Sequence, residues 1–187
     1  MYTTDWFSHH APLWKSAFGH LEGLPNLRAL EIGTFEGRSA VWMLGHVLTH
    51  DTSRIVCVDT FEGSDEHGPE QTTNMFDTFC ENIQSQKHKV RICKGRSADV
   101  LKTPELVNSK FDIVYIDGDH HSAAVLEDAV LAFPLLKSGG IMVFDDYAWN
   151  DVLSLDSCHI GIECFLRCYA DKLRVVHMGM QVFIQKL

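Results

Sequence analysis

The chain has 187 residues, of which 45% are hydrophobic and 22% are charged, and its formal net charge is −9. This length allows one domain with a full hydrophobic core, and the acidic balance without a run of Lys or Arg argues against a nucleic-acid partner. No apolar run approaches the ~20 residues that a membrane span needs, and the opening residues lack a basic segment followed by an apolar stretch. We therefore expect a cytoplasmic protein without a membrane partner.

Short β-branched runs alternate along the chain with longer segments of helical periodicity. Strand-like runs cover residues 27–33, 54–59, 89–95, 111–117 and 140–146. Helical patterns cover 38–48, 75–83, 97–107, 125–133 and 158–172, and Pro134 with Gly139 and Gly140 is expected to help end the fourth. Two short strands around Gly179 predict a final hairpin.

This alternation predicts an α/β fold of the Rossmann-like kind. We expect a seven-stranded, mostly parallel sheet with helices on both faces, into which the C-terminal hairpin places one antiparallel strand. No internal repeat or linker divides the chain, so residues 1–187 are predicted to form a single domain, with 1–25 as an N-terminal arm.

Polar clusters follow each of the predicted parallel strands. They are "EIGTFEGRS" after the first, Asp59 after the second, "GRS" after the third, "DGDHH" after the fourth and "DDY" after the fifth. In such sheets ligands bind outside the carboxyl ends of the strands. The sequence therefore predicts a binding site at this edge.

The stretch "EIGTFEG" has the spacing of a nucleoside pocket. Gly33 would let the backbone turn sharply off the strand, and Gly37 would let a ligand approach the next helix. The dinucleotide fingerprint G-x-G-x-x-G is absent, because Phe35 stands at its middle position, and this disfavours a nicotinamide-dependent oxidoreductase. Asp59 could accept hydrogen bonds from both ribose hydroxyls. Ordinary turn glycines are the alternative interpretation.

The stretches "LEIGTFEGRSAVWML" and "DGDH…GGIMVFDDY" resemble the class I S-adenosylmethionine-dependent methyltransferases. The resemblance runs from about residue 27 to the C-terminus and is greatest to the metal-dependent O-methyltransferases that act on catechol, caffeoyl-coenzyme A and macrolide sugars. It implies S-adenosylmethionine as cofactor, with Gly33 at its methionine part, Ser39 at its carboxylate, Asp59 at its ribose and Ser97 at its adenine. The implied cofactor-binding set is Glu31, Gly33, Thr34, Phe35, Ser39, Asp59, Thr60, Ser97 and Asp117. Arg96 departs from the family, which often has an acidic residue there.

Three aspartates, Asp117, Asp145 and Asp146, are expected to converge at the same edge. Carboxylates brought close repel one another, so they need a proton, a basic partner or a cation. No Lys or Arg occurs in "DGDHHSAA" or "DDYAWND", and oxygen ligands favour Mg²⁺, with Ca²⁺ or Mn²⁺ as substitutes. The resemblance places a metal on these three positions. Alternatively, Asp117 binds only the cofactor's amino group and the pair caps the next segment.

His120 lies three residues after Asp117, and we predict that these two residues form the catalytic pair. The catechol branch has a basic Lys at this offset and the macrolide-sugar branch can have a His. An imidazole is a workable base near neutral pH. Asp119 could orient His120 or act as the base itself, and an exposed histidine at a helix start is the alternative.

The sequence thus predicts a methyltransferase acting on a hydroxyl of a small metabolite. The acceptor would lie under the N-terminal arm, which carries Trp6, Phe7 and Trp14, and the loops 62–74 and 147–157, and a second subunit of a homodimer could complete the pocket. Two rival hypotheses are a metal-independent methyltransferase that uses His120 or Asp119, and a nucleoside-binding module without catalysis.

Overall fold

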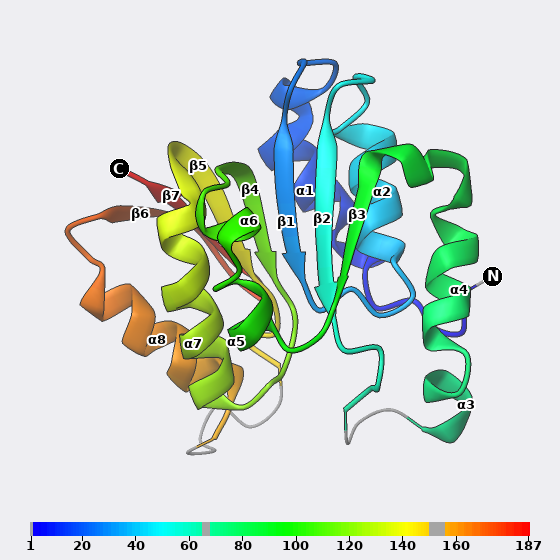
Figure 1. Cartoon of the computed structure of the whole chain (residues 1–187). Helices are drawn as coiled ribbons and strands as arrows, with labels where there is room; N and C mark the ends of the chain where they lie inside the picture. The colour runs from blue at the N-terminus through cyan, green and yellow to red at the C-terminus, as the bar shows by residue number, and fades with distance from the viewer. Residues whose placement is uncertain (1, 65–67, 150–155) are drawn as a thin grey trace.

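A twisted seven-stranded sheet forms the centre of the computed structural model, which describes residues 2–64, 68–149 and 156–187 (Figure 1). The strand order is β3-β2-β1-β4-β5-β7-β6. The strands are β1 (Arg28–Ile32), β2 (Arg54–Asp59), β3 (Val90–Lys94), β4 (Phe111–Ile116), β5 (Leu136–Phe144), β6 (Leu173–Met178) and β7 (Val182–Lys186). The first five are parallel and β7 pairs antiparallel with β5 and β6, so the predicted Rossmann-like sheet and hairpin are confirmed.

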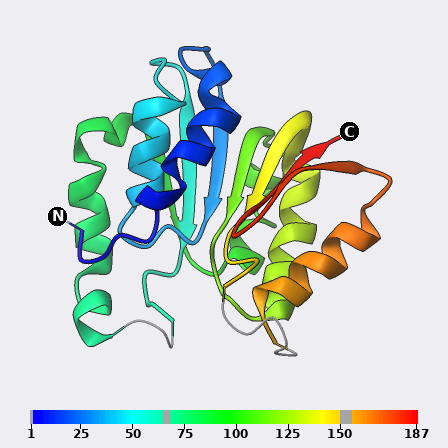
Figure 2. The same ribbon diagram turned by 180° about the vertical axis from the view of Figure 1, so that it is seen from behind.

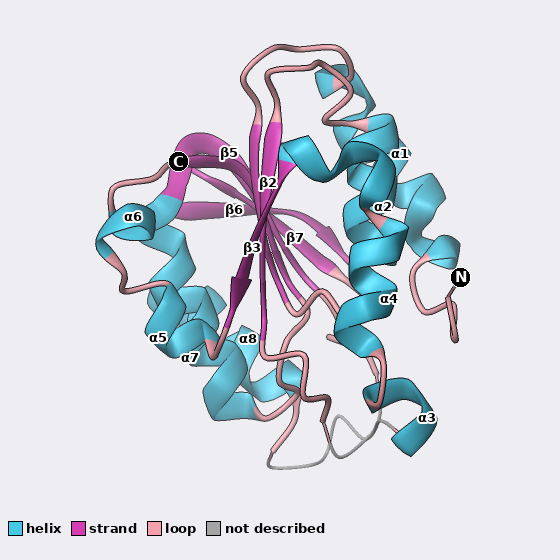
Figure 3. Ribbon diagram, turned by 45° about the vertical axis from the view of Figure 1, so that its right-hand side comes forward, coloured by secondary structure: helices cyan, strands magenta, loops and turns pink. Residues whose placement is uncertain are grey.

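Helices cover both faces of the sheet, as Figures 2 and 3 show. One face carries α1 (Ala11–Phe18), α2 (Arg38–His46) and α4 (Met75–Asn82). The other carries α5 (Ser97–Val100), α6 (Pro104–Val107), α7 (Ser122–Ala132) and α8 (Cys158–Cys168). The short α3 (Pro69–Thr72) follows β2, and 3-10 turns occupy Ser8–His10, Gly19–Leu21, Gln84–Lys89 and Phe133–Leu135. No described helix is long and apolar enough to cross a membrane.

The N-terminal segment contributes a helix to the core. In α1, Trp14 and Phe18 are fully buried, and the Trp14 ring packs edge-on against Tyr115 of β4 with centroids 4.9 Å apart. The Phe18 ring stacks on Phe183 of β7. Because these contacts join α1 to two strands, the residues predicted as an arm are held firmly over one face of the sheet.

Two local predictions were wrong. The segment 97–107 forms two short helices instead of one, because Pro104 lacks an N–H and instead begins α6 at its first turn. Gly139 and Gly140 lie inside β5 and do not end the preceding helix. A Cβ at Gly140 would lie 2.9 Å from the carbonyl oxygen of Asp112, so this glycine allows β5 to pass close to β4.

Candidate functional site

A cavity of about 690 Å³ opens at the carboxyl ends of the parallel strands, the lower edge in Figure 1. The sequence-predicted residues that line it are Gly33, Thr34, Phe35, Ser39, Asp59, Thr60, Ser97, Asp117, His120, Asp145 and Asp146. Trp6 and Phe7 of the N-terminal segment also line this cavity. The predicted loops 62–74 and 147–157 lie partly outside the described residues, at 65–67 and 150–155. The cluster expected at one edge of the sheet is therefore brought together in one cavity.

Two glycines shape the loop after β1, and each is required by packing. Both have positive φ, +76° at Gly33 and +79° at Gly37. A Cβ at Gly33 would lie 1.8 Å from the carbonyl oxygen of Asp117, so only glycine lets the loops after β1 and β4 touch. A Cβ at Gly37 would lie 2.7 Å from the Phe79 ring. Gly37 therefore makes room for a core side chain, and the contact that requires glycine here differs from the ligand contact predicted from the sequence.

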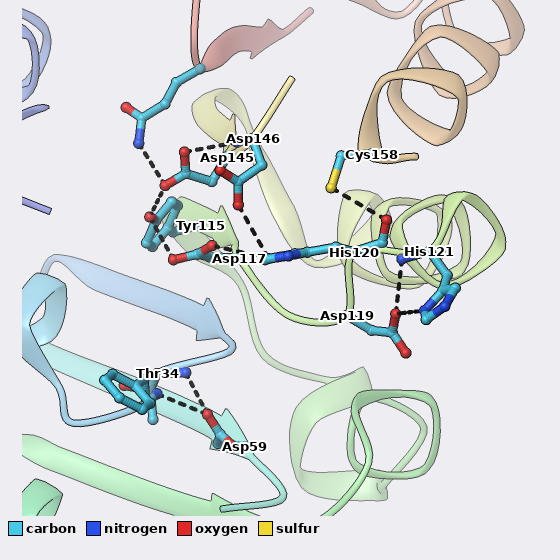
Figure 4. A network of polar contacts seen from close by, with 12 residues as sticks. Thr34, Asp59, Tyr115, Asp117, Asp119, His120, His121, Asp145, Asp146 and Cys158 are labelled. Atoms are coloured by element: carbon cyan, nitrogen blue, oxygen red, sulfur yellow. Dashed lines mark hydrogen bonds and ion pairs between the residues drawn. The ribbon is translucent and has the colours of Figure 1, made fainter. Parts of the chain in front are cut away.

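Asp59 ties the loop after β1 to the loop after β2 (Figure 4). Its Oδ2 accepts hydrogen bonds from the backbone N–H groups of Thr34, at 2.7 Å, and Phe35, at 2.9 Å. Its Oδ1 accepts one from the N–H of Phe61 at 2.7 Å. The carboxylate is thus fixed in position at the cavity wall, and the remaining lone pair of Oδ1 can serve a ligand.

Glu31 lies beneath the cavity wall and is fully buried. It accepts hydrogen bonds from the hydroxyls of Ser39 and of Thr34, the latter at 3.0 Å. Burial raises its pKa to about 7, although these hydrogen bonds lower it. Ser39, predicted to hold the cofactor carboxylate, therefore has its hydroxyl directed at Glu31.

His120 lies between two carboxylates in the group that could hold a metal ion. Its Nε2 is 3.1 Å from Oδ2 of Asp146 and 4.0 Å from Oδ1 of Asp117 (Figure 4). One ligand atom from each of the three residues lies within 4.8 Å of the others. Asp146 has a left-handed backbone with φ of 56°, which separates its side-chain direction from that of Asp145.

Asp145, predicted as a metal ligand, is instead held by the protein. Its Oδ2 accepts hydrogen bonds from the Tyr115 hydroxyl and, at 2.8 Å, from the Gln181 amide. Its Oδ1 accepts one from the N–H of Asp146, and the side chain is 10% exposed. Gln181 in turn accepts a hydrogen bond from the Trp14 indole. Among the described residues, the group with ligand atoms close enough to hold a metal ion therefore consists of Asp117, His120 and Asp146.

Negative charge is concentrated around Asp117. Desolvation raises the pKa of its carboxyl, and the neighbouring carboxylates of Asp145 and Asp146 raise it further. Tyr115 also lies 2.9 Å from Asp117, yet its single proton cannot serve both Asp117 and Asp145. A second proton, a cation, or the positive charge of His10 or His120 if protonated can compensate this charge, since these imidazoles lie 3.7 Å from Asp145 and 3.1 Å from Asp146.

Asp119 does not orient His120, which was one of its predicted roles. Its Oδ1 lies 2.5 Å from Nδ1 of His121 and accepts the backbone N–H of the same residue at 2.8 Å. Both side chains are more than half exposed. The pair is therefore a surface turn beside the site, and Asp146 takes the place beside His120.

Sequence reasoning missed Asp128, which lines the cavity. This residue of α7 is 3% exposed and hydrogen-bonded to Ser97, and burial raises its pKa to about 6. Thr4 Oγ1 and Arg38 Nε are buried without a hydrogen-bond partner in the described structure, and both residues also line the cavity. A charged residue inside an apolar helical pattern was the available signal for Asp128.

Comparison with known proteins decides the family. The model of the family described as "Methyltransferase domain" matches residues 30–147. The chain belongs to this methyltransferase-domain family. The resemblance to class I methyltransferases is thereby confirmed, and the matched segment extends from β1 to the acid pair after β5.

The matches to similar proteins cover most of the chain. Uncharacterized protein R132 of Acanthamoeba polyphaga mimivirus is 29% identical over 138 residues, which cover 70% of this chain and 58% of R132. An O-methyltransferase from Bacillus cereus, solved with SAH, has a TM-score of 0.71 at 18% identity. The match covers 99% of this chain and 84% of the Bacillus cereus chain. MycE methyltransferase from the mycinamycin biosynthetic pathway, solved with Mg, SAH and mycinamycin VI, has a TM-score of 0.67 at 19% identity. That match covers 98% of this chain and 50% of MycE. These structures share the fold of this chain.

Proposed function

We propose that this chain is an S-adenosylmethionine-dependent O-methyltransferase acting on a hydroxyl of a small molecule. The observation that carries the proposal is that the loop after β1 and the His120 group line one cavity. The family match supports methyl transfer, and the bound SAH and Mg in structures of the same fold support the cofactor and a cation. The chain spans 58% of R132, so this proposal concerns the domain described.

The cavity wall offers groups that fit the cofactor. The free lone pair of Asp59 is positioned to accept a ribose hydroxyl, and Ser97 with Asp128 offers oxygen acceptors for the adenine amino group. The unpartnered Thr4 Oγ1 and Arg38 Nε fit a carboxylate, because a buried polar group without a partner is costly. We assign them to the methionine carboxylate, in place of Ser39. When bound, the cofactor supplies an electrophilic methyl group.

The acid group fits a divalent cation. Asp117 and Asp146 offer the oxygen ligands that Mg²⁺, Ca²⁺ or Mn²⁺ prefer, and excess negative charge surrounds them. A cation held there would lower the pKa of an acceptor hydroxyl. Nε2 of His120 must carry a hydrogen to pair with the Asp146 carboxylate, so it cannot also bind a metal. We therefore propose that His120 is the base and that the two aspartates are the ligands.

In this mechanism Nε2 of His120 carries the hydrogen that it donates to Asp146 at 3.1 Å, so the unprotonated Nδ1 accepts the proton of the acceptor hydroxyl. The acceptor oxygen then forms a bond to the methyl carbon as the carbon–sulfur bond breaks, which gives a methyl ether and S-adenosylhomocysteine. The cavity walls contribute by holding the two reacting atoms in line at near-attack distance.

Cofactor identity is tested first, by calorimetric titration of the purified chain with S-adenosylmethionine and with NAD. We expect saturable binding of S-adenosylmethionine, and tighter binding of NAD would overturn the proposal. Transfer of a labelled methyl group to a panel of hydroxylated small molecules then tests catalysis. Cofactor binding without transfer to any acceptor would favour a non-catalytic nucleoside-binding module.

A metal-independent methyltransferase is the second candidate function. It is favoured by the direct contact of His120 with Asp146, which supplies a positioned base without a cation. The same transfer assay with Mg²⁺ or with a chelator separates the two candidates. Activity that survives the chelator unchanged would select the metal-independent mechanism.

A further inference from the structure

A second cavity, of about 550 Å³, lies at the opposite edge of the sheet, the upper edge in Figure 1. Its lining includes the first residue of each of four neighbouring strands. These residues are Arg28, Arg54, Val90 and Phe111. Strands of five or six residues at ~3.3 Å per residue separate this cavity from the candidate cofactor site by roughly 16–20 Å. The second cavity is therefore a separate feature of the molecule.

Its lining is strongly basic in a protein whose net charge is −9. Five of the 16 lysines and arginines line it together with one histidine, and no described Asp or Glu lines it. The basic residues are Arg28, Arg54, His88, Lys89, Arg91 and Lys110. Far fewer would be expected in one cavity if the cations were spread over the surface.

Strand register places three arginines side by side. Arg28 on β1 is aligned with Arg54 on β2, and Arg91 on β3 is aligned with Val56, two residues after Arg54. In a parallel sheet such positions face the same side. Like charges aligned on neighbouring strands repel one another, so the arrangement destabilises the empty protein.

Three of these basic side chains donate hydrogen bonds to neutral backbone carbonyl groups. Arg54 donates to the carbonyl oxygens of Asp51, at 2.5 Å, and Ser53, at 2.8 Å, and Lys110 donates to that of Pro134 at 2.7 Å. The buried Lys89 donates to the carbonyl oxygen of Leu48. Carbonyl dipoles orient these side chains without neutralising their charge.

Two carboxylates lie near the cavity, but neither forms an ion pair with its basic lining. Asp112 is engaged by the Lys137 ammonium at 2.7 Å and by the backbone N–H of Arg28 at 2.8 Å. Asp51 attracts Lys89 but is exposed and lies outside the lining. Among the described residues, no carboxylate forms an ion pair with any of the six basic side chains.

We propose that this cavity binds a small organic anion carrying two or more phosphate groups. Arginine forks bind phosphate oxygens in pairs, and three of them reach one cavity here. Ile55, Leu106 and Phe111 supply an apolar part of the lining, which fits an organic group attached to the phosphates. The volume of about 550 Å³ and the acidic remainder of the chain favour a small ligand over a nucleic acid.

Calorimetric titration of the purified chain with pyrophosphate and with ADP tests the site. We expect saturable binding of both that weakens at higher salt, and tighter binding of ADP, since its nucleoside can use the apolar lining. The double variant Arg28→Gln/Arg91→Gln should weaken pyrophosphate binding roughly tenfold or more. Both side chains are exposed, so the variant should fold, and Lys110→Gln provides a second variant of the same lining.

Arg167→Gln on α8 is the matched control, because its side chain is 82% exposed and does not line the cavity. It should leave pyrophosphate binding unchanged, and all variants should bind S-adenosylmethionine as the wild type does. Absence of saturable binding of either anion, or an equal loss in the control, would overturn the proposal. Tighter binding of a single-stranded RNA than of ADP would also overturn it. ADP is titrated with the cofactor cavity saturated by S-adenosylmethionine, because its adenosine could otherwise bind there. Pyrophosphate has no nucleoside, so its binding tests the second cavity independently of the proposed methyl transfer.

Discussion

The imidazole of His120 lies 3.1 Å from the carboxylate of Asp146, although the two residues follow different strands of the sheet. The contact joins the loop after β4 to the loop after β5. It places a proton acceptor and an anionic partner at the wall of the candidate cofactor cavity.

Replacing this base should stop methyl transfer while leaving cofactor binding intact. We expect His120→Gln to lower kcat by roughly 10²–10⁴-fold, the usual contribution of a general base, with an unchanged Kd for S-adenosylmethionine. His121→Gln is the matched control, since its side chain is 66% exposed and contacts Asp119. Turnover of His120→Gln within about twofold of wild type would exclude the proposed role.

Substitutions of the two aspartates after β5 should have different effects, one on metal binding and the other on stability. Asp146→Ala should abolish stimulation by Mg²⁺, because it removes a proposed ligand. Asp145→Ala should instead cost about 1–3 kcal/mol of unfolding free energy, because Tyr115 and Gln181 lose a buried acceptor. Chemical denaturation and Mg²⁺ titration of turnover measure the two effects. A larger stability loss in the Asp146 variant would contradict this assignment.

Glu31 should make the stability of the protein fall as pH rises. Its folded pKa of about 7 exceeds the ordinary 4.5, so the folded state binds the proton more tightly between these values. The stabilisation is present below pH 4.5 and is lost as pH rises through about 7. Glu31→Gln should therefore gain up to about 2–3 kcal/mol relative to wild type between about pH 5 and 8. Urea unfolding at about pH 5 and pH 8 measures the free energy of unfolding of both proteins. Glu105→Gln, at an exposed position, is the control and should show no pH-dependent gain relative to wild type.

Adding one methyl group at Gly33 should be far more harmful than at other glycines. Gly33→Ala places a Cβ 1.8 Å from the Asp117 carbonyl oxygen at positive φ, so we expect a loss of at least about 3 kcal/mol or failure to fold. Gly45, inside α2, has open space around the added atom, and Gly45→Ala should stabilise by about 0.5–1 kcal/mol. Thermal unfolding of both variants provides the comparison. Equal melting temperatures would show that the loops can separate.

Arg38 should determine affinity for the amino-acid part of the cofactor. Arg38→Gln removes the unpartnered Nε and is expected to raise the Kd of S-adenosylmethionine roughly tenfold, while the Kd of adenosine stays unchanged. Calorimetry with both ligands measures the difference. If both affinities fall together, Arg38 acts on the loop as a whole and not on the carboxylate. Arg96→Gln, at the Ser97 end of the cavity, is the control for loss of charge.

The fold and the edge that carries the site could be predicted because their signals are local. Each strand shows its own apolar run, and parallel strands must present the residues that follow them at one edge. The surroundings of each aspartate after β5 could not be read from the sequence, because consecutive aspartates differ only in backbone geometry. The left-handed φ of Asp146 directs it to His120, while Asp145 finds Tyr115 and Gln181. The basic cavity was missed because Arg28, Arg54 and Lys110 lie far along the sequence from the group 88–91, and the sheet brings them together.

Asp145 is supported by a chain of hydrogen bonds through Gln181 to Trp14, two residues 167 positions apart. A contact between such distant segments can form only in a chain that contains both of them. The segment 30–147 that matches the family model contains every acidic residue of the site but neither Trp14 nor Gln181. A fragment with these limits would still match the methyltransferase family model, but it would lack the buried hydrogen bonds that fix Asp145. The segment that identifies the family is therefore shorter than the segment needed to position the acidic residues of the site.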